Sequence, residues 1–303
     1  MKKILCVLLV AVLCLACCGE TVPERIVSGY YISTSLVLAL GGGDRLVGIE
    51  AKANTRALYA LAAPELIELP SVGTLKQLDL EAVIGLNPDL IILPLKQLEA
   101  ANTLRELGFT VVVVNPESYE EMLETIDEVA AAMGADAGAL REYYAQKTAK
   151  LAALVEGKPS VQVYLAGNSS YLKTAGEGMY QDTLLNMAGG TNVAAEIEGG
   201  YWTEISYEQL LEWNPEVIIM AADAAYTRED ILNDALLQGV AAVKTGRVYA
   251  LPSVPEAWDS PVPGAILGSL WIAAQLYPEE YGAAEFTEDA NEFYMSFYGF
   301  EFN

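Results

Sequence analysis

The side chains that could do chemistry in this chain are mainly carboxylates and phenols, because the sequence contains no histidine. This excludes serine–histidine and cysteine–histidine nucleophiles, and also histidine-ligated zinc and copper sites. Paired carboxylates could still act as acid and base, and the close pairs are Glu196 with Glu198 and Glu204 with Glu208. Short spacing along the chain does not place two carboxyl groups across a site, so we predict that the protein is not an enzyme. A surface hydrolase with paired carboxylates is kept as a remote alternative.

Two segments far apart in the chain repeat one pattern. LDLEAVIGLNPDLIIL occupies positions 78–93, and ISYEQLLEWNPEVIIM occupies positions 205–220. Asp79 and Ser206 are favourable helix N-caps, and the proline of each Asn-Pro pair disfavours helix at the residue before it. The apolar runs that follow are typical of strands buried on both faces. A helix–turn–strand unit used twice predicts two lobes of similar build.

The N-terminus has the pattern of an export signal. Lys2 and Lys3 precede an uncharged apolar run that is too short for a membrane-spanning helix and fits a signal-peptide core. The run ends in Leu-Ala-Cys-Cys-Gly, which resembles a bacterial lipobox. Cys18 follows a leucine by three positions and a small residue by two, so we predict that it is lipidated, with Cys17 as the alternative. All four cysteines lie in this segment, so we expect no disulfide in the exported domain.

The charge balance limits the partners of this chain. It has 17 basic and 41 acidic residues, a formal net charge of −24. Such a protein is repelled by nucleic acids and by anionic lipid headgroups. No stretch after the signal is long and apolar enough to span a bilayer, so we expect an extracytoplasmic protein held at the membrane by its lipid anchor alone.

Strands alternate with helices along the chain, which predicts an α/β fold with mostly parallel sheets. The helical run ALREYYAQKTAKLAALV stands between the two halves, where a connector between lobes belongs. The predicted division is a signal peptide with lipobox at 1–18, a tether at 19–24, an N-terminal lobe at 25–134, a connecting helix at 135–157 and a C-terminal lobe at 158–303.

Ligands of open α/β sheets gather beyond the carboxyl ends of the strands. Aromatic residues recur in the loops expected there, and their flat faces suit a large, partly apolar ligand such as a chelate or macrocycle, although tyrosine is also common on exported surfaces. The predicted ligand-binding residues are Tyr30, Tyr31, Lys52, Lys96, Tyr180, Tyr201, Trp202, Tyr226, Trp258 and Asp259.

Two further roles of these loops remain open. The few cations there, Lys52, Arg56, Lys96 and Lys173, could pair with ligand carboxylates or simply be solvated. Four of the tyrosines could ligate haem or ferric iron through phenolate, but no spacing requires it, so we predict neither a bound metal site nor a cofactor.

In the order and spacing of several phrases, the chain resembles the substrate-binding lipoproteins of bacterial ABC importers. The phrases are LVLALGGGDRLVGI, VGTLKQLDLEAVIGLNPDLII, LLNMAGGTNVA, ISYEQLLEWNPEVIIM and GRVYAL. The branch in question is class III, which serves iron-siderophore, haem and corrinoid uptake. The resemblance implies two Rossmann-like lobes joined by one long rigid helix, with the ligand groove between them. The zinc and manganese relatives use histidine ligands, so that branch is not expected.

The resemblance also implies partners and a cargo. In this family a glutamate on each lobe docks onto arginines of the permease, and the matching residues here are Glu81 and Glu208. Both also suit the first turn of a helix, where the dipole favours an acid. The expected partners of this monomer are an ABC permease and ATPase, and the expected cargo is a metal chelate, most simply a ferric siderophore, with haem and corrinoid open. A small oxyanion such as molybdate or tungstate, or a nickel chelate, is the alternative.

Overall fold

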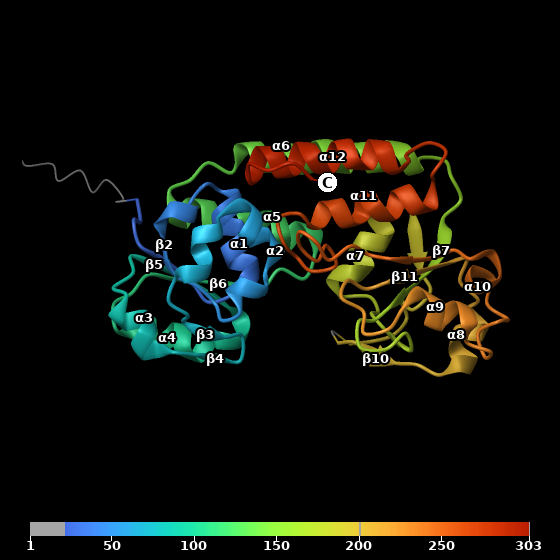
Figure 1. Ribbon diagram of the computed structural model, residues 1–303, viewed down its shortest axis with the longest axis horizontal. Helices are drawn as coiled ribbons and strands as arrows, with labels where there is room; N and C mark the ends of the chain where they lie inside the picture. Colours follow the sequence, from blue (N-terminus) through green and yellow to red (C-terminus); the bar gives the residue numbers. More distant parts are fainter. Residues whose placement is uncertain (1–21, 200, 303) are drawn as a thin grey trace, which may run out of the picture.

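The structure is a computed structural model that describes residues 22–199 and 201–302. Two α/β lobes lie beside each other, and two long helices run across both along one side (Figure 1). The predicted α/β fold with parallel sheets in two lobes is therefore confirmed. Cys17 and Cys18, and the first half of the predicted tether (19–21), fall outside the described residues.

The N-terminal lobe is built on a four-stranded parallel sheet in the order β2-β1-β5-β6. Its strands are β1 (Ile26–Ser28), β2 (Leu46–Gly48), β5 (Leu90–Pro94) and β6 (Val111–Val114). The helices around it are α1 (Tyr31–Ala39), α2 (Ala57–Ala62), α3 (Leu80–Gly85), α4 (Leu98–Glu106) and α5 (Tyr119–Met133). A small antiparallel hairpin joins β3 (Gly73–Thr74) to β4 (Gln77–Leu78).

The C-terminal lobe repeats this plan with a parallel sheet in the order β12-β11-β7-β9. Its strands are β7 (Val161–Ala166), β9 (Gly190–Asn192), β11 (Val217–Met220) and β12 (Val248–Ala250). Its helices are α7 (Tyr180–Met187), α8 (Tyr207–Trp213), α9 (Arg228–Asn233), α10 (Ala241–Thr245) and α11 (Ala265–Leu276). Two short strands, β8 (Lys173–Thr174) and β10 (Thr203–Glu204), pair antiparallel at one edge.

The repeated segment folds alike in both lobes. Asp79 accepts a hydrogen bond from the backbone N–H of Ala82 at 3.0 Å, and Ser206 accepts one from the N–H of Gln209 at 3.2 Å, so both caps are confirmed. After each helix an asparagine adopts a left-handed backbone, with φ of 47° at Asn87 and 44° at Asn214. Asparagine tolerates that conformation better than most residues, and the following proline excludes helix. The strand after each turn is fully buried.

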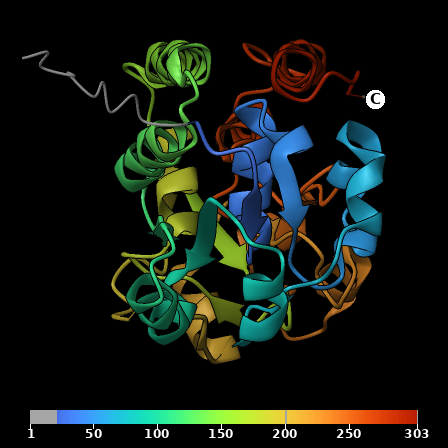
Figure 2. The ribbon, with the colours of Figure 1, turned by 90° about the vertical axis from the view of Figure 1, so that its left-hand side faces the viewer.

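One long helix connects the lobes along the chain, as expected, and a second long helix from the C-terminal segment packs along it. Helix α6 (Gly138–Val155) lies within the predicted connector, and α12 (Ala283–Phe297) runs beside it (Figures 1 and 2). The Tyr298 hydroxyl, just after α12, donates to the carbonyl of Ser35 in α1 at 3.1 Å, which ties the C-terminal segment to the N-terminal lobe. The sequence pattern marked this segment only as an aromatic helix; its path across both lobes depends on contacts distant in the chain.

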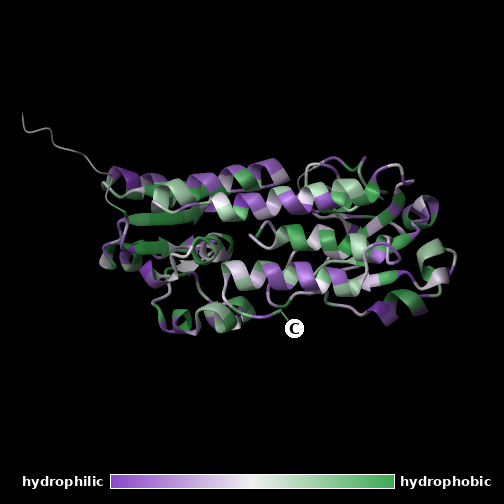
Figure 3. Ribbon diagram, turned by 90° about the horizontal axis from the view of Figure 1, so that it is seen from above, coloured by the Kyte–Doolittle hydropathy of each residue, from purple (hydrophilic) through white to green (hydrophobic). Residues whose placement is uncertain are grey.

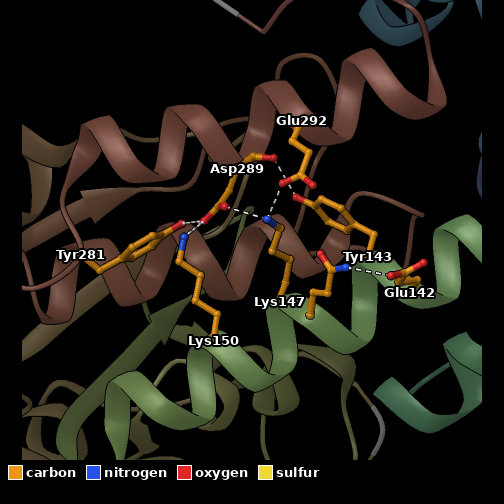
Figure 4. Close-up of polar contacts among 8 residues, drawn as sticks. Glu142, Tyr143, Lys147, Lys150, Tyr281, Asp289 and Glu292 are labelled. Carbon is orange, nitrogen blue, oxygen red and sulfur yellow. Dashed lines mark hydrogen bonds and ion pairs between the residues drawn. The ribbon is translucent and has the colours of Figure 1, made fainter.

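A cluster of charges around buried Lys147 and Asp289 joins α6 to α12 (Figure 4). Lys147 of α6 donates to Asp289 at 2.8 Å and to Glu292 at 2.5 Å, and Lys150 donates to the other Asp289 oxygen at 2.6 Å. The Tyr281 hydroxyl also donates to Asp289, at 2.7 Å. Asp289 is thus a buried carboxylate compensated by two cations, an arrangement that fixes the two helices relative to each other.

The remaining surfaces follow the usual pattern of an α/β protein. Strands β5, β6 and β11 are apolar along their length, whereas the long helices carry both polar and apolar residues (Figure 3). In the part of the chain that the structure describes, no helix combines the length and the apolar character needed to cross a bilayer.

Candidate functional site

A cavity of about 450 Å³ lies where the two lobes meet, partly open to solvent. Its wall is formed by residues from three parts of the chain: the N-terminal lobe, the C-terminal lobe and the loop between β12 and α11. The N-terminal lobe supplies Tyr31, Ser35, Thr55, Arg56, Ala57, Leu58 and Tyr59; the C-terminal lobe supplies Asn168, Gln181, Trp202, Ala222 and Asp223; and the loop supplies Ser253, Val254, Pro255, Glu256, Ala257, Asp259 and Ser260.

The loop is held from behind by the two long helices. Trp258 is completely buried and its indole N–H donates to the Tyr294 hydroxyl of α12 at 2.9 Å. Farther along, the carbonyl of Pro263 accepts a hydrogen bond from the Tyr144 hydroxyl of α6 at 2.8 Å. The side of the loop that faces the cavity is therefore placed by the same helices that fix the two lobes.

The N-terminal lobe presents an aromatic ring and a cation. Tyr31, the first residue of α1, lies under the Arg56 guanidinium at 4.3 Å from the ring centroid. Tyr31 from this lobe and Ser260 from the loop both line the cavity. Beneath it, Tyr59 and Thr34 each donate to a different oxygen of buried Glu50, both at 2.7 Å.

The C-terminal lobe presents amides, an acid and an indole. Gln181 of α7 donates to the carbonyl of Asp259 at 2.7 Å, and the backbone N–H of Ala222 donates to the Asp259 carboxylate at 3.0 Å. The Trp202 ring rests against Gly167, where a Cβ would come within 2.8 Å of it, so glycine is required for this close approach. These contacts hold Asp259 and Trp202 in the cavity wall.

Burial shifts the two acids of the loop toward their neutral forms. It raises the pKa of Asp259 to about 6, against the opposing effect of the Ala222 N–H. It raises the pKa of Glu256 to about 8, although Tyr294 and the backbone N–H of Gly264 hydrogen-bond the carboxyl. Near neutral pH the wall therefore carries fewer negative charges than its three acids imply.

Three of the ten predicted ligand-binding residues lie in the cavity wall: Tyr31, Trp202 and Asp259. Contact with a ligand remains a prediction for each. Arg56, considered as a cation near the groove, lies there as well, while Lys173 is in the β8 strand outside it.

The other seven predicted residues lie outside this wall. Tyr30 packs edge-on against Tyr31 at 4.9 Å, Tyr180 and Trp258 are buried in the core, and Tyr226 donates to the carbonyl of Gly167 at 2.8 Å. Trp258 turns inward because an aromatic cluster formed by α12 and the C-terminal residues receives it, with Phe286 and Phe302 against its ring. The remaining three, all exposed, are Lys52, Lys96 and Tyr201.

Several wall residues were not predicted. Asn168, Gln181 and Glu256 carry no motif, and a polar residue in a loop is ordinarily solvated. The carboxyl-end rule could have pointed to Asn168, which closely follows β7. The position of Glu256 depends on packing against α12, and no local pattern encodes it.

The acidic pairs considered for catalysis do not enter this cavity. Glu196, Glu198, Glu204 and Glu208 are absent from its wall. Within residues 22–199 and 201–302, no three aspartate or glutamate side chains gather closely enough to hold a bare metal ion.

The two glutamates of the repeat are exposed at the N-termini of equivalent helices. Glu81 lies in the first turn of α3 and Glu208 in the first turn of α8. These helices lie on different lobes, on the side of the molecule away from α6 and α12 (Figures 1 and 2). Backbone and Ser206 hydrogen bonds lower the pKa of Glu208, so this carboxylate is ionised at neutral pH.

Comparison with known proteins finds relatives that are all named as binding proteins. The molybdate-binding protein MolA of Haemophilus influenzae is 25% identical over 310 aligned positions, covering 92% of this chain and 88% of MolA. The uncharacterized ABC transporter substrate-binding lipoprotein YvrC of Bacillus subtilis is 25% identical over 86% of this chain and 82% of its own length. A vitamin B12-binding protein of Salmonella choleraesuis is 30% identical over 62% of this chain and 69% of its own length.

Solved structures agree on the fold. A periplasmic solute-binding protein of Veillonella parvula superposes with a TM-score of 0.79 at 27% identity, covering 93% of this chain and 89% of that one. The nickel–histidine complex of CeuE from Helicobacter pylori superposes with a TM-score of 0.78 at 20% identity, covering 92% and 91%. Residues 26–255 match the family model described as periplasmic binding protein. The chain therefore belongs to the periplasmic binding protein family, as a class III substrate-binding protein of ABC transporters, and it is not an enzyme.

Proposed function

We propose that this protein captures a compact metal chelate between its lobes and delivers it to an ABC permease. The observation that carries the proposal is the size and polarity of the cavity. Its volume of about 450 Å³ lies toward the low end of the range for small-molecule sites, roughly 300–1,000 Å³. A corrinoid or haem would leave much of its surface outside, so the cavity favours the compact end of the metal chelates that the sequence indicates.

The chemistry of the wall supports a chelate with mixed polar groups. Tyr31 and Trp202 offer aromatic faces, Arg56 offers one cation, and Asn168 and Gln181 offer amides. A ferric siderophore, the first expectation from sequence, fits this description only if it is small or partly exposed. The nickel–histidine ligand named for CeuE has the appropriate size, although that relative supports the fold alone.

A small oxyanion is the second candidate, because of one specific observation. MolA, named for molybdate binding, aligns over 92% of this chain, and Arg56 lies in the wall with the hydroxyl groups of Ser260 and Ser253. Asp223 and Asp259 oppose a dianion, which is why we rank the oxyanion below a chelate.

A ligand panel tests the proposal. Purified protein is heated with nickel–histidine, small ferric siderophores, molybdate, tungstate, haemin and cyanocobalamin. A ligand that binds the folded state raises the apparent stability, by about 2.7 kcal/mol at a concentration one hundred times its Kd. We expect the largest shift with a compact chelate. A shift with cyanocobalamin or haemin alone would contradict the proposal.

We also propose that Cys18 carries the lipid anchor, supported by the lipobox-like sequence and by the lipoprotein name of YvrC. In a bacterial host, Cys18→Ala should release the protein from the membrane fraction while Cys17→Ala leaves it attached. The reverse result would assign the anchor to Cys17.

A further inference from the structure

Arg56 is a cation of the cavity wall that has no acidic partner within the protein. It precedes α2, lines the cavity and is exposed to solvent. In the part of the chain that the structure describes, Arg56 belongs to no ion pair, although the sequence has 41 acidic residues and only 17 basic ones. Its charge is therefore available to a ligand.

Tyr31 positions this cation. The Arg56 guanidinium lies over the Tyr31 ring, 4.3 Å from its centroid, and both residues line the same cavity. A guanidinium attracted to an aromatic ring keeps its N–H groups for other partners, and its planar fork of donors matches the two oxygens of a carboxylate. Because the ring restrains the side chain before a ligand arrives, the pair is suited to binding a carboxylate.

Two carboxylates stand on the other side of the cavity. Asp223 comes soon after β11, lines the cavity and is exposed. Asp259, from the loop before α11, is held next to it, because its Oδ2 accepts a hydrogen bond from the N–H of Ala222 at 3.0 Å. No ion pair within residues 22–199 and 201–302 includes either acid.

Both acids contribute negative charge to this side. Burial raises the pKa of Asp259 only to about 6, so its carboxyl is still largely ionised at about pH 7.5. Asp223 adopts a left-handed backbone with φ of 56°, which aspartate and asparagine tolerate better than other residues with a side chain. The wall is thus divided by charge, with the cation on the N-terminal lobe and the acids on the C-terminal lobe and the loop.

We propose that the cargo is a bipolar chelate, which presents a carboxylate to Arg56 and turns N–H donors or positive charge toward Asp223 and Asp259. This inference rests on the proposed function and narrows it to metal chelates of amino-acid type. An oxyanion such as molybdate satisfies Arg56 but is repelled by the two acids, whereas a purely cationic complex is attracted by the acids and repelled by Arg56.

The carboxylate contact is tested with nickel–L-histidine and nickel–histamine as probes, by titration calorimetry of the purified protein at about pH 7.5. Histamine keeps the amine and imidazole of histidine and lacks its carboxylate. Wild type should bind nickel–histamine about tenfold more weakly, the effect of one lost charge-assisted hydrogen bond. Arg56→Gln should weaken nickel–histidine by about the same factor and leave nickel–histamine within about twofold, because its partner is absent there.

The matched control for Arg56→Gln is Lys52→Gln. Lys52 is an exposed cation just before Arg56 in the chain and lies outside the cavity wall. Its loss should change the affinity for either nickel probe by less than about twofold, because exposed charges outside the site are screened.

The acidic side is tested with Asp223→Asn, since asparagine tolerates the same backbone conformation. Removal of this charge should weaken nickel–histidine about threefold and strengthen molybdate by a similar factor. The opposite signs separate an electrostatic role from a general disturbance of the cavity. Asp44→Asn removes an exposed acid outside the wall and should change neither affinity.

Equal losses for both nickel probes in Arg56→Gln, or tighter nickel–histidine binding in Asp223→Asn, would overturn the bipolar assignment and leave capture of a chelate intact. Binding of molybdate or tungstate alone would also overturn it. If another chelate of the panel is the cargo, a loss below about threefold in Arg56→Gln overturns it as well. Wild type that binds no member of the panel would remove the proposed function and this inference with it.

Discussion

Trp202 and Tyr201 are neighbours in the chain with opposite surroundings. Trp202 lines the cavity against Gly167, whereas Tyr201 is 82% exposed and lies outside it. Both were candidate ligand contacts by residue type, and only their placement separates them. This pair offers a direct comparison of two aromatic side chains on one loop.

Trp202→Ala should weaken ligand binding about tenfold, because the flat indole face buries ligand surface that alanine leaves in water. Tyr201→Ala should change the affinity by less than about twofold, since an exposed ring outside the wall loses no contact. Titration calorimetry with the same ligand measures both. Equal losses in the two variants would show that the ligand binds elsewhere on this loop.

Glu256 also makes the stability of the protein depend on pH. Its pKa rises from 4.5 to about 8 on burial, so folding takes up a proton between these values. The stabilisation relative to Glu256→Gln is complete below about pH 4.5 and is lost as the pH rises through about 8. Urea unfolding should therefore show wild type losing up to about 1.4 kcal/mol per pH unit relative to the variant in this window. Parallel pH profiles would contradict a buried neutral carboxyl.

Helices α6 and α12 act as a paired support for the lobes and the loop. Hydrogen bonds from Lys147, Lys150 and Tyr281 lower the pKa of Asp289 even though burial opposes its ionisation. The Asp289 carboxylate is the common partner of both lysines, so we expect its charge to contribute more to the stability of the helix pair than any other charge in the cluster.

Asp289→Asn should lower the free energy of unfolding by about 3 kcal/mol, at the low end for a broken buried pair because Lys147 keeps Glu292. The matched control is Asp127→Asn, which breaks the surface ion pair between Asp127 and Arg141. The charged atoms of that pair are 3.7 Å apart, and the side chains are 56% exposed for Asp127 and 41% for Arg141. That change should cost less than about 1 kcal/mol. Chemical denaturation measures both. A loss no larger than the control's would show that the cluster does not stabilise the helix pair.

At the scale of the entire protein, the candidate cavity and the two proposed docking glutamates lie apart. The cavity lies between the lobes, while Glu81 and Glu208 lie on opposite lobes along the side away from α6 and α12 (Figure 1). Two carboxylates so placed can read the distance between the lobes and meet a basic partner, which supports the proposed permease docking.

The double variant Glu81→Ala, Glu208→Ala should reduce ligand uptake about tenfold or more without changing ligand affinity, because neither side chain is near the cavity. Transport in proteoliposomes with the cognate permease and ATPase measures the first, and calorimetry the second. Exposed Glu288→Ala on α12 removes the same charge from the opposite side and should leave both unchanged. Uptake equal to wild type in the double variant would exclude docking through these residues.

The sequence was most informative where structure is local. The caps Asp79 and Ser206 and the Asn-Pro turns follow from neighbouring residues, so both lobes could be predicted. The direction of Trp258 could not, because it depends on an aromatic cluster contributed from the far end of the chain. The position of Glu256 could not be predicted for the same reason, because its neighbours Tyr294 and Gly264 come together only through packing.

The most direct test of ligand capture in this cavity is the Kd of a cavity-blocking variant. Ala57 begins α2 and lines the wall, whereas Ala60 on the same helix is exposed and outside it. With the ligand identified by the panel, Ala57→Trp should weaken binding at least about a hundredfold by filling the cavity, while Ala60→Trp binds like wild type. Wild-type affinity in Ala57→Trp would contradict the account, because the ligand would then bind outside the space between the lobes.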